Sequence, residues 1–444
     1  KNTDKRPNII FIQLESFFDV GYEKNLQFSE DPLPVFHSLQ KKYSSGLVTV
    51  PTVGAGTVNT EFEILTGMRQ HDFGVSEYPY KTVLKSKTSE SICTDLKKLG
   101  YSTHAVHNNE ATFYGRNTVF SNIGFDTFCS MEYMNGLTDS PNGWSNDDVL
   151  SREIMKTLDS TSGPDFTMAI TVQSHGKYDG IALDDPTIKV TGAPEGKEQA
   201  YEYYVNEIHE VDRMIDTLIK ELSNRKEETV LVLYGDHLPS LDIQKDDLSN
   251  ANLYQTQYVV WDNMNLKKKT KNLHAYQLYA EVLDRIQIHE GMITKYHQQT
   301  KHRSKLYLTG LTTLSYDLLY GDNYAYDGEN PFKQTELQMG TEPVKLTSVQ
   351  KTKSGYRVVG SGFTPYCKVY YDGTLVESEW ISSECLQLQD EFELDEADKK
   401  DSGEPETEVT EPRDVPNAFV VEVQSDDGVV LSSTQAYPAS QVKK

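Results

Sequence analysis

Residues that could carry chemistry recur directly after buried strands that the sequence predicts. Glu15 follows the apolar run PNIIFIQL, and His175 follows FTMAITV with only two residues between. Asp236 and His237 come just after TVLVLYG, the most strand-like run of the chain. Each residue alone has an ordinary explanation, as a solvated acid or a hydrogen-bonded core histidine. The carboxyl ends of parallel strands meet at one edge of a sheet, where ligands bind, so their shared placement indicates a functional site.

Thr57 stands in a different setting, between a small-residue run and an apolar helical pattern. Gly54 and Gly56 precede it, and glycine lets the backbone approach a ligand closely. The first turn of a helix favours an anion, because its N–H groups are free. A hydroxyl there is either an N-cap or a nucleophile that attacks phosphorus. The stretch by itself favours the cap, whereas the polar strand ends elsewhere favour the nucleophile.

Two carboxylates, one imidazole and one hydroxyl make a mixed donor set that suits a divalent cation such as Mn²⁺, Mg²⁺ or Zn²⁺. The four residues are Glu15, Thr57, Asp236 and His237. A cation there would lower the pKa of the Thr57 hydroxyl and neutralise phosphate oxygens during in-line displacement. His107, Arg116 and His175 could bind the phosphate or protonate the leaving group.

The hydrophobic pattern supplies elements that could position these residues. Strands are predicted over 7–14, 46–50, 101–106, 124–128, 166–172, 229–234 and 258–261, and helices over 34–43, 88–99, 146–158, 197–223 and 274–287. The helix over 88–99 is expected to be capped by Thr88 or Ser89. Strands that alternate with helices are typical of an α/β fold with a mostly parallel central sheet and helices on both faces.

The pattern changes near residue 340. Short β-rich runs separated by turns, at 344–349, 356–359, 368–371, 418–423 and 429–431, predict a separate β-sandwich. We therefore expect a catalytic domain over 1–338 and a sandwich over 339–444. The acidic composition of an insertion over 390–414 predicts a solvated loop. The insertion lacks the ligand spacing of an EF-hand, so the sequence gives little reason to expect calcium there.

The totals exclude some classes of protein. With 43 Lys and Arg against 67 Asp and Glu, the formal net charge of −24 excludes nucleic-acid binding by bulk electrostatics. The 4 cysteines are too few for a disulfide framework, although a single disulfide stays open. No apolar run reaches the roughly 18 residues of a membrane helix. We expect a soluble protein or the soluble part of a larger one.

Five motifs occur in order: PNIIFIQLES, then GxGTxxTEF around Thr57, HNN followed by Arg116, QSH and YGDH. This set resembles the lipoteichoic acid synthase group, a branch of the alkaline phosphatase/sulfatase superfamily, over about residues 7–320. The resemblance implies a sulfatase-like fold and a phosphoglycerol transferase. Phosphatidylglycerol would transfer glycerol phosphate to Thr57 and release diacylglycerol, and the acceptor would be a glycolipid or a polyglycerol phosphate (lipoteichoic-acid-type) polymer.

The resemblance also implies roles for single residues. Glu15, Thr57, Asp236 and His237 match the ligands of one metal ion, with Mn²⁺ expected and Mg²⁺ or Zn²⁺ as alternatives. His107, Arg116 and His175 match positions that bind glycerol phosphate. Family members carry N-terminal membrane helices, so this chain is expected to be an ectodomain at the extracellular face of a bacterial membrane.

The sequence departs from the family in two places. Tyr114 stands where the family often has Trp, and its ring could still stack on glycerol. The C-terminal sandwich resembles an Ig-like module of the IPT/TIG type, on the residues VGSGF at 359–363 and VYYDG at 369–373. Its role is open between a spacer, a cell-wall attachment module and a passive packing domain.

Four other functions compete to explain the same residues. A sulfatase needs a modified Cys or Ser in C/S-x-P-x-R, which the sequence lacks. A two-zinc phosphatase or phosphodiesterase needs further ligands, for which His209, Asp212 and His175 are candidates. A phosphoethanolamine transferase uses a similar residue set but is usually richer in disulfides. An inactive binding or wall-anchoring protein has no reason to retain all four metal-site residues.

Overall fold

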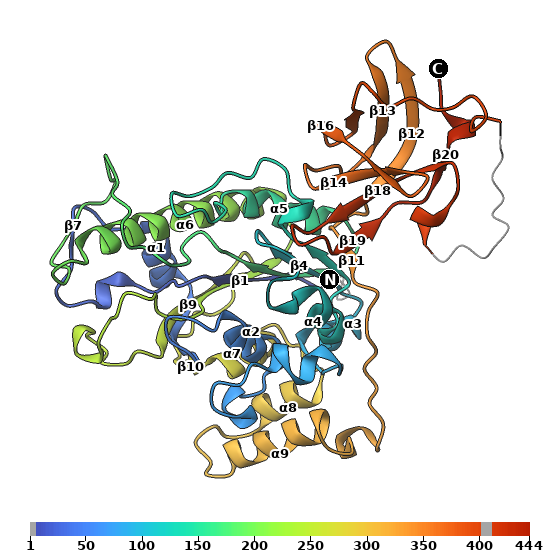
Figure 1. Ribbon diagram of the computed structural model, residues 1–444. Coiled ribbons are helices and arrows are strands. Elements are labelled where there is room, and N and C mark those ends of the chain that lie inside the picture. The colour runs from blue at the N-terminus through green and yellow to red at the C-terminus, as the bar shows by residue number, and fades with distance from the viewer. Residues whose placement is uncertain (1–5, 401–410) are drawn as a thin grey trace. The chain divides into compact units, whose positions relative to one another are not determined.

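A computed structural model describes residues 6–400 and 411–444 (Figure 1). The chain forms two compact units, of which the first comprises the residues through Asn108 together with Tyr114–Asp126 and Thr138–Leu337. The second contains Asn109–Phe113, Thr127–Leu137 and the C-terminal residues from Gln338. The assignment of 1–338 as a catalytic domain and of 339–444 as an Ig-like domain stays a prediction.

The first unit is built on a sheet with the strand order β10-β3-β9-β8-β1-β6-β4. β1 pairs in parallel with both β6 and β8, and β4 pairs in parallel with β6, whereas β9 is antiparallel to β8 and β3. The prediction of a mostly parallel α/β sheet is therefore confirmed. The strands are Asn8–Leu14 (β1), Ser44–Thr49 (β3), Ser102–His107 (β4), Asp165–Ile170 (β6), Thr229–Gly235 (β8), Gln255–Asp262 (β9) and Leu273–His274 (β10). A small separate ribbon pairs β2 (Gln27–Phe28) with β7 (Val190–Thr191).

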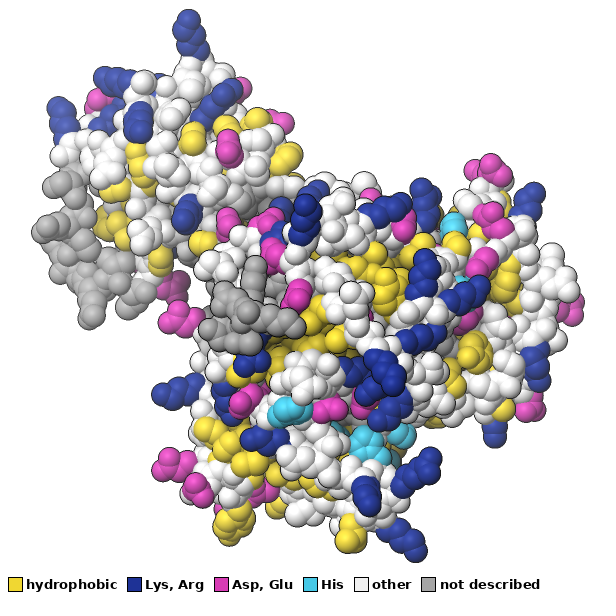
Figure 2. All heavy atoms as spheres, turned by 180° about the vertical axis from the view of Figure 1, so that it is seen from behind, with side chains coloured by type: hydrophobic (Ala, Val, Ile, Leu, Met, Phe, Trp, Pro, Cys, Tyr) yellow, Lys and Arg dark blue, Asp and Glu magenta, His cyan; other side chains and the backbone are white. Residues whose placement is uncertain are grey.

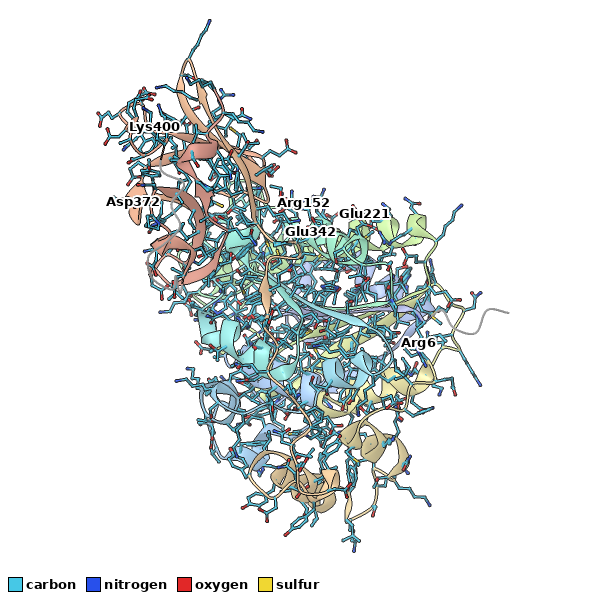
Figure 3. All side chains as sticks on the ribbon, turned by 90° about the vertical axis from the view of Figure 1, so that its right-hand side faces the viewer. Arg6, Arg152, Glu221, Glu342, Asp372 and Lys400 are labelled. Atoms are coloured by element: carbon cyan, nitrogen blue, oxygen red, sulfur yellow. The ribbon has the colours of Figure 1, made fainter. Side chains whose placement is uncertain are left out.

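Helices cover both faces of this sheet (Figure 1). They are α1 (Pro34–Lys42), α2 (Thr57–Thr66), α3 (Ile92–Lys97), α4 (Arg116–Ile123), α5 (Val149–Asp159), α6 (Glu198–Arg225), α7 (Ala275–Arg285), α8 (Met292–Gln299) and α9 (Tyr307–Leu319). Because both faces are covered, β1 and β8 are buried along their whole length, which explains their nearly continuous apolar sequence. Charged residues such as Arg6 and Arg152 lie on the outside (Figure 3).

Three helices and one cap differ from the sequence predictions. α4, α8 and α9 were not predicted, and residue 116, which was expected in a loop, begins α4. The cap of α3 is Ser91, whose Oγ accepts hydrogen bonds from the N–H groups of Cys93 and Thr94. The expectation of Thr88 or Ser89 was wrong because the chain stays extended until Ser91.

The second unit contains two antiparallel sheets around one apolar core. One has the order β12-β13-β17-β16, and the other the order β15-β14-β18-β19 with β20 on β18. The strands of this unit are Thr127–Cys129 (β5), Gln338–Met339 (β11), Lys345–Thr352 (β12), Gly355–Ser361 (β13), Cys367–Tyr371 (β14), Thr374–Val376 (β15), Ser378–Ser382 (β16), Cys385–Leu388 (β17), Ala418–Gln424 (β18), Val430–Ser433 (β19) and Tyr437–Pro438 (β20). Part of the predicted acidic insertion, 401–410, lies outside the described residues.

Hydrogen bonds explain why 127–137 belongs to this unit. Thr364 Oγ1 donates to the carbonyl oxygen of Glu132 at 2.6 Å, and Asn135 Nδ2 donates to that of Phe363 at 2.9 Å. All four cysteines are free thiols, so no disulfide links the described strands. Among the described residues, no helix is both long enough and apolar enough to cross a membrane.

α6 fixes the start of α1 through side chains that had been considered as extra metal ligands. The Asp212 carboxylate accepts the N–H groups of Val35 at 2.9 Å and Phe36 at 2.8 Å. His209 Nδ1 donates to the carbonyl oxygen of Pro32 at 2.7 Å. Both side chains therefore hold the helix start, and neither belongs to the possible metal group that the described residues form at Glu15, Asp236 and His237.

His37 on α1 lies between Asp19 Oδ2 and Asp31 Oδ2, each 2.8 Å from a ring nitrogen. The hydrogen bond to Asp19, assisted by Asp31, raises the pKa of His37 from 6.5 to about 9. Because the folded-state pKa is the higher one, this stabilisation is fully present below the unfolded value and is lost as the pH rises through about 9.

His37→Gln is therefore expected to lower the free energy of unfolding by about 1 kcal/mol near pH 6, after allowance for partial exposure, and by little near pH 10. Urea unfolding of both proteins at the two pH values measures this difference. The exposed His71→Gln is the control and should change stability equally little at both. An equal loss for His37→Gln at both pH values contradicts the assignment.

Candidate active site and metal centre

Thr57 is the first residue of α2 and does not cap it. The N-cap is Gly56 in the left-handed region, with φ 86°, and no side chain caps this end of the helix. A Cβ at Gly56 would lie 2.7 Å from Thr52 Oγ1, so the close turn requires glycine. Thr57 Oγ1 instead donates to Glu15 Oε2 at 3.0 Å. The cap that this stretch alone favoured was wrong, and the hydroxyl is free for chemistry.

The end of β1 places Glu15 beside Asp236. The Glu15 backbone is held on both sides, since its N–H donates to Thr171 Oγ1 at 2.8 Å and its carbonyl oxygen accepts from Ser174 Oγ at 2.6 Å. The Ser16 N–H donates to Asp236 Oδ1 at 2.7 Å, and a positive φ of 49° at Ser16 then turns the chain. This turn brings together the acids that end two neighbouring parallel strands.

His237 presents one ring nitrogen to these acids. Its Nδ1 lies 2.8 Å from the carbonyl oxygen of Leu238, and because a carbonyl only accepts, Nδ1 carries the hydrogen. In the neutral ring Nε2 is then a lone-pair donor. Nε2 lies 3.4 Å from Thr57 Oγ1, 3.7 Å from Glu15 Oε1 and 3.4 Å from Asp236 Oδ2.

These side chains fit a divalent cation. Glu15, Asp236 and His237 are buried, and one possible ligand atom from each lies within 4.8 Å of the others. Asp236 Oδ2 is buried and has no hydrogen-bond partner within the described structure. Burial, with the charge of Glu15, raises the pKa of Asp236 well above its ordinary range. Burial also opposes ionisation of Glu15, but the His237 and His175 rings outweigh it and lower the pKa of Glu15. A cation would stabilise both carboxylates in their charged form.

We expect the protein to retain about one equivalent of Mn²⁺ after dialysis, and Asp236→Asn to weaken the affinity at least about tenfold. Metal analysis of the dialysed proteins, together with the metal-dependent rise in melting temperature, measures this. Asp31→Asn, which lies outside the metal group, is the control. Equal metal content in wild type and Asp236→Asn contradicts the ligand assignment.

Arg116 lies in a second buried group beside α2. Its Nε donates to Glu61 Oε1 at 3.1 Å and its Nη2 to Glu61 Oε2 at 2.6 Å, and both side chains are at most 1% exposed. Tyr80 and Gln13 also donate to the Glu61 carboxylate. Arg116 Nη1 is buried with no hydrogen-bond partner among the described residues, so one donor remains for an anion.

Glu61 belongs to the GxGTxxTEF motif, but the sequence predicted no role for it. One signal was available, because Glu61 follows Thr57 by four residues and therefore lies on the same face of α2. A carboxylate on the face of the presumed nucleophile calls for a cationic partner. Only the fold shows that this partner is Arg116.

His107 and Tyr114 adjoin this second group. His107 Nδ1 donates to the carbonyl oxygen of Ile170 at 2.8 Å, and burial, with the charge of Arg116, lowers the pKa of His107 well below its ordinary value. His107 is thus a neutral ring whose Nε2 can accept a hydroxyl hydrogen. Tyr114, with a φ of 57°, stacks on Tyr78 at 6.3 Å, and the Arg116 guanidinium lies 5.5 Å from its ring. Tyr78 was missed in the sequence.

His175 is the most accessible of the predicted residues, with a side chain 36% exposed and Nε2 3.9 Å from Glu15 Oε1. Its Nδ1 donates to the Gly176 carbonyl oxygen at 2.6 Å. Trp144, which the sequence did not single out, lies 4.4 Å from the imidazole between ring centres. Trp144 Nε1 also donates to Gly176 at 2.8 Å, so indole and imidazole form one wall.

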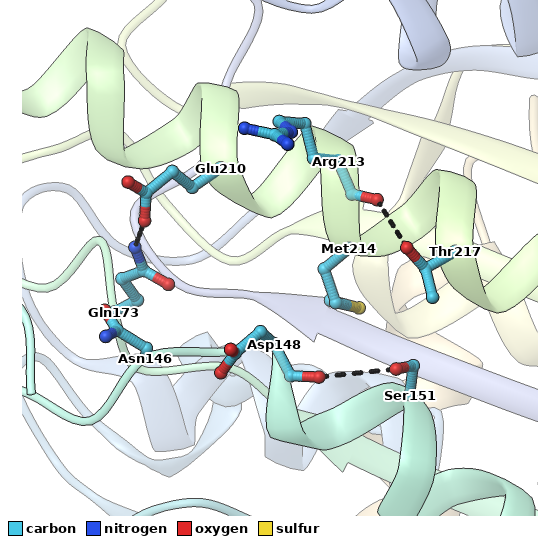
Figure 4. A pocket seen from close by; sticks show the side chains of 8 residues that line it. All are labelled: Asn146, Asp148, Ser151, Gln173, Glu210, Arg213, Met214 and Thr217. Carbon is cyan, nitrogen blue, oxygen red and sulfur yellow. Dashed lines mark hydrogen bonds between the residues drawn. The ribbon is translucent and has the colours of Figure 1, made fainter. Parts of the chain in front are cut away.

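A polar pocket of about 350 Å³ has Gln173, two residues before His175, in its lining (Figure 4). Gln173 Nε2 donates to Glu210 and its Oε1 accepts from the Asp147 N–H at 2.8 Å. The pocket is lined by Asn146, Asp148, Ser151, Gln173, Glu210, Arg213, Met214 and Thr217. Gln173 therefore belongs to this pocket and not to the metal group.

The structure places the predicted site residues in two adjacent groups. Glu15, Thr57, Asp236 and His237 converge as expected, with His175 at their edge. His107, Tyr114 and Arg116 form the second group, around Glu61. Gln13 Nε2 donates both to the carbonyl oxygen of Thr57 at 3.2 Å and to Glu61 Oε2 at 3.5 Å, so the groups are neighbours.

Two acids and a histidine at the ends of parallel strands, beside a hydroxyl that begins a helix, form a group that could hold a divalent cation. Residues 7–328 match the family model described as Sulfatase, which is more than half of the chain. The chain therefore belongs to the sulfatase family.

Curated relatives divide between glycan and lipoteichoic acid proteins. The "Putative cyclic beta-1,2-glucan modification protein" of Rhizobium meliloti (strain 1021) is 30% identical over 60% of this chain and 43% of its own length. Lipoteichoic acid synthase 2 of Bacillus subtilis (strain 168) is 24% identical over 44% of this chain and 30% of its own length. The chain thus spans less than half of these relatives.

Two solved structures share the fold. The phosphoglycerol transferase GacH of Streptococcus pyogenes, in complex with sn-glycerol-1-phosphate, has a TM-score of 0.63 at 22% identity and covers 76% of this chain and 92% of its own. The lipoteichoic acid synthase LtaP of Listeria monocytogenes has a TM-score of 0.54 at 20% identity, over 66% of this chain and 75% of its own. These similarities confirm the predicted sulfatase-like fold.

Proposed function

We propose that this chain is the catalytic ectodomain of a metal-dependent phosphoglycerol transferase with Thr57 as its nucleophile. The observation that carries the proposal is the position of Thr57 Oγ1, which starts a helix 3.0 Å from Glu15 Oε2 and 3.4 Å from His237 Nε2. Relatives named lipoteichoic acid synthase and phosphoglycerol transferase support the reaction class. The donor is phosphatidylglycerol, and the acceptor is a glycolipid or a polyglycerol phosphate polymer.

The transfer has two displacements. Thr57 Oγ1 gives up its proton and forms a bond to the phosphorus of phosphatidylglycerol. The bond to the diacylglycerol oxygen breaks, and that oxygen takes up a proton from His175. An acceptor hydroxyl then attacks the same phosphorus and restores the Thr57 hydroxyl. A divalent cation held by Glu15, Thr57, Asp236 and His237, with Mn²⁺ expected, supplies charge that lowers the pKa of the hydroxyl and stabilises the phosphate oxygens.

The second group of residues binds the glycerol phosphate. Arg116 Nη1 is the open donor for a phosphate oxygen, because Glu61 occupies the other side of the guanidinium. His107 Nε2 accepts a glycerol hydroxyl, and Tyr114 packs against the glycerol carbons. His175, with its exposed ring, protonates the leaving oxygen.

The location follows from the donor. We propose that the chain lies at the extracellular face of a bacterial membrane and is anchored by an N-terminal membrane region outside this sequence. Nucleic acid is not a partner, since the net charge of −24 repels it. The β-sandwich unit has no assigned part in the transfer.

Intact-mass measurement after incubation with phosphatidylglycerol and Mn²⁺ tests the nucleophile and the donor together. We expect an adduct of glycerol phosphate mass on wild type and none on Thr57→Ala, because Thr57 Oγ1 lies beside both Glu15 Oε2 and His237 Nε2. An adduct formed only from phosphatidylethanolamine points to a phosphoethanolamine transferase. Unchanged phosphodiester cleavage by Thr57→Ala contradicts the assignment of Thr57.

Glu61→Gln is expected to raise KM for phosphatidylglycerol about tenfold, because Arg116 loses its charged partner and its fixed orientation. Steady-state kinetics measure the change, and metal content should stay that of wild type. Glu63→Gln, two residues further along the same helix, is the matched control and should leave KM unchanged. A fall in metal content for Glu61→Gln contradicts a role confined to Arg116.

A further inference from the structure

Two segments of the first unit carry basic residues and no Asp or Glu, which is unusual in a chain of net charge −24. The segment 263–274 contains Lys267, Lys268, Lys269 and Lys271. The segment 291–316 contains Lys295, Lys301, Arg303 and Lys305. Because 67 acids are spread over the chain, these stretches are local reversals of its charge.

The two segments meet in space. Lys269, Lys271, Lys301 and Arg303 line one cavity of about 480 Å³, together with His302. Glu281 and Asp284 also line it, and Glu281 pairs with Lys271 at 3.0 Å. Within the part of the chain that the structure describes, no carboxylate forms an ion pair with the other three cations. We call Lys269, Lys271, Lys301, His302 and Arg303 the basic surface. Figure 2 shows Lys and Arg gathered beside His in the lower right of the view.

α9 continues this surface with an exposed face that carries no charge. Leu308, Thr312, Tyr316 and Tyr320 follow one another at four-residue spacing, with Leu308 38%, Tyr316 62% and Tyr320 45% exposed. The charged residue within α9, Asp317, is turned to the N–H groups of the residues that follow the helix. Surface helices normally expose charged residues, so an uncharged exposed face is unusual. Tyr320 packs on Phe73 at 5.9 Å between ring centres, whereas Tyr316 stays 62% exposed.

The basic surface and the α9 face adjoin at the start of α9. Leu306, the residue before the helix, is 74% exposed and follows Lys305 directly. Tyr296 on α8 donates to the carbonyl oxygen of Tyr307 at 2.6 Å, and the His302 ring lies 4.7 Å from that of Tyr307. These contacts fix the basic corner against α9.

We propose that the basic surface and the α9 face together dock on a membrane surface that contains anionic phospholipid. Lys and Arg are attracted to anionic head groups, and exposed Leu and Tyr enter the head-group region beside them. A protein partner fits less well, since Lys is depleted from protein interfaces whereas Lys beside Leu and Tyr is typical of membrane-surface segments. The docking needs no chemistry at Thr57, although under the proposed function it would hold the enzyme at the membrane that supplies its donor.

Sedimentation of the full chain with vesicles tests the proposal. In EDTA, which removes divalent ions, we expect binding to vesicles of phosphatidylcholine with phosphatidylglycerol or with phosphatidylserine, little binding to phosphatidylcholine alone, and release by salt. Changing Lys269, Lys271, Lys301 and Arg303 to Glu should reduce the bound fraction at least about tenfold. Changing Lys24, Lys245, Lys353 and Lys368 to Glu alters net charge equally and should leave much more protein bound.

Insertion of the α9 face has its own readout. The fluorescence of Tyr316→Trp should shift to the blue when phosphatidylglycerol vesicles are added, whereas that of Tyr254→Trp, at an exposed position away from α9, should not. Sedimentation of the four-Glu variant like wild type, or an unshifted Tyr316→Trp spectrum in bound protein, overturns the proposal. Binding confined to phosphatidylglycerol also overturns it, since it indicates head-group recognition at the active site.

The two proposals fail separately. The four-Glu variant should form the Thr57 adduct with a short-chain, water-soluble phosphatidylglycerol as readily as wild type. If neither protein forms the adduct while the wild type still binds vesicles, the result counts against the phosphoglycerol transferase and not against docking. Capture by a membrane protein in place of lipid vesicles makes the partner of this surface a protein and overturns the docking proposal.

Discussion

The candidate active site depends on holding two buried carboxylates, Glu15 and Asp236, close together. Burial makes an isolated charge costly, and a second charge of the same sign adds to the cost. Hydrogen bonds offset part of that cost. The Ser16 N–H donates to Asp236, and Thr171 and Ser174 hydrogen-bond the backbone of Glu15. What the arrangement still lacks is positive charge, and the orientation of His237 leaves a lone pair where a cation would complete it.

α2 links the two halves of the site. Thr57 and Glu61 lie one helical turn apart on the same face, so a single rigid element positions both the presumed nucleophile and the carboxylate that orients Arg116. A shift of α2 would therefore move the Thr57 hydroxyl together with the carboxylate that holds Arg116. Under the proposed function, this coupling would keep the distance from nucleophile to phosphate constant, as an in-line displacement needs.

Charge is distributed unevenly over the first unit. The chain is strongly acidic, yet its Lys- and Arg-rich segments lie beside the uncharged face of α9. An anionic bilayer repels an acidic protein except where a basic surface faces it. The excess of negative charge elsewhere on the chain therefore favours the orientation in which the basic surface faces the bilayer. This effect is electrostatic and apolar in origin and is separate from the metal-dependent chemistry proposed at Thr57.

The sequence by itself determined the α/β class and the strand ends. Apolar runs such as those before Glu15 and Asp236 predict buried parallel strands, because both faces of the sheet are covered. It also placed the metal-site candidates, since polar residues at the carboxyl ends of parallel strands must share an edge.

Partners that lie far apart in the sequence could not be predicted from it. The pairing of Glu61 with Arg116, 55 residues apart, the packing of Trp144 on His175 and the capping of α1 by Asp212 exist only once distant segments meet. Local pattern also failed at Thr57, where it favoured a cap, because Glu15, which accepts the hydroxyl, lies outside the segment. At α9 only the tertiary structure shows which residues stay exposed, among them Leu308 and Tyr316.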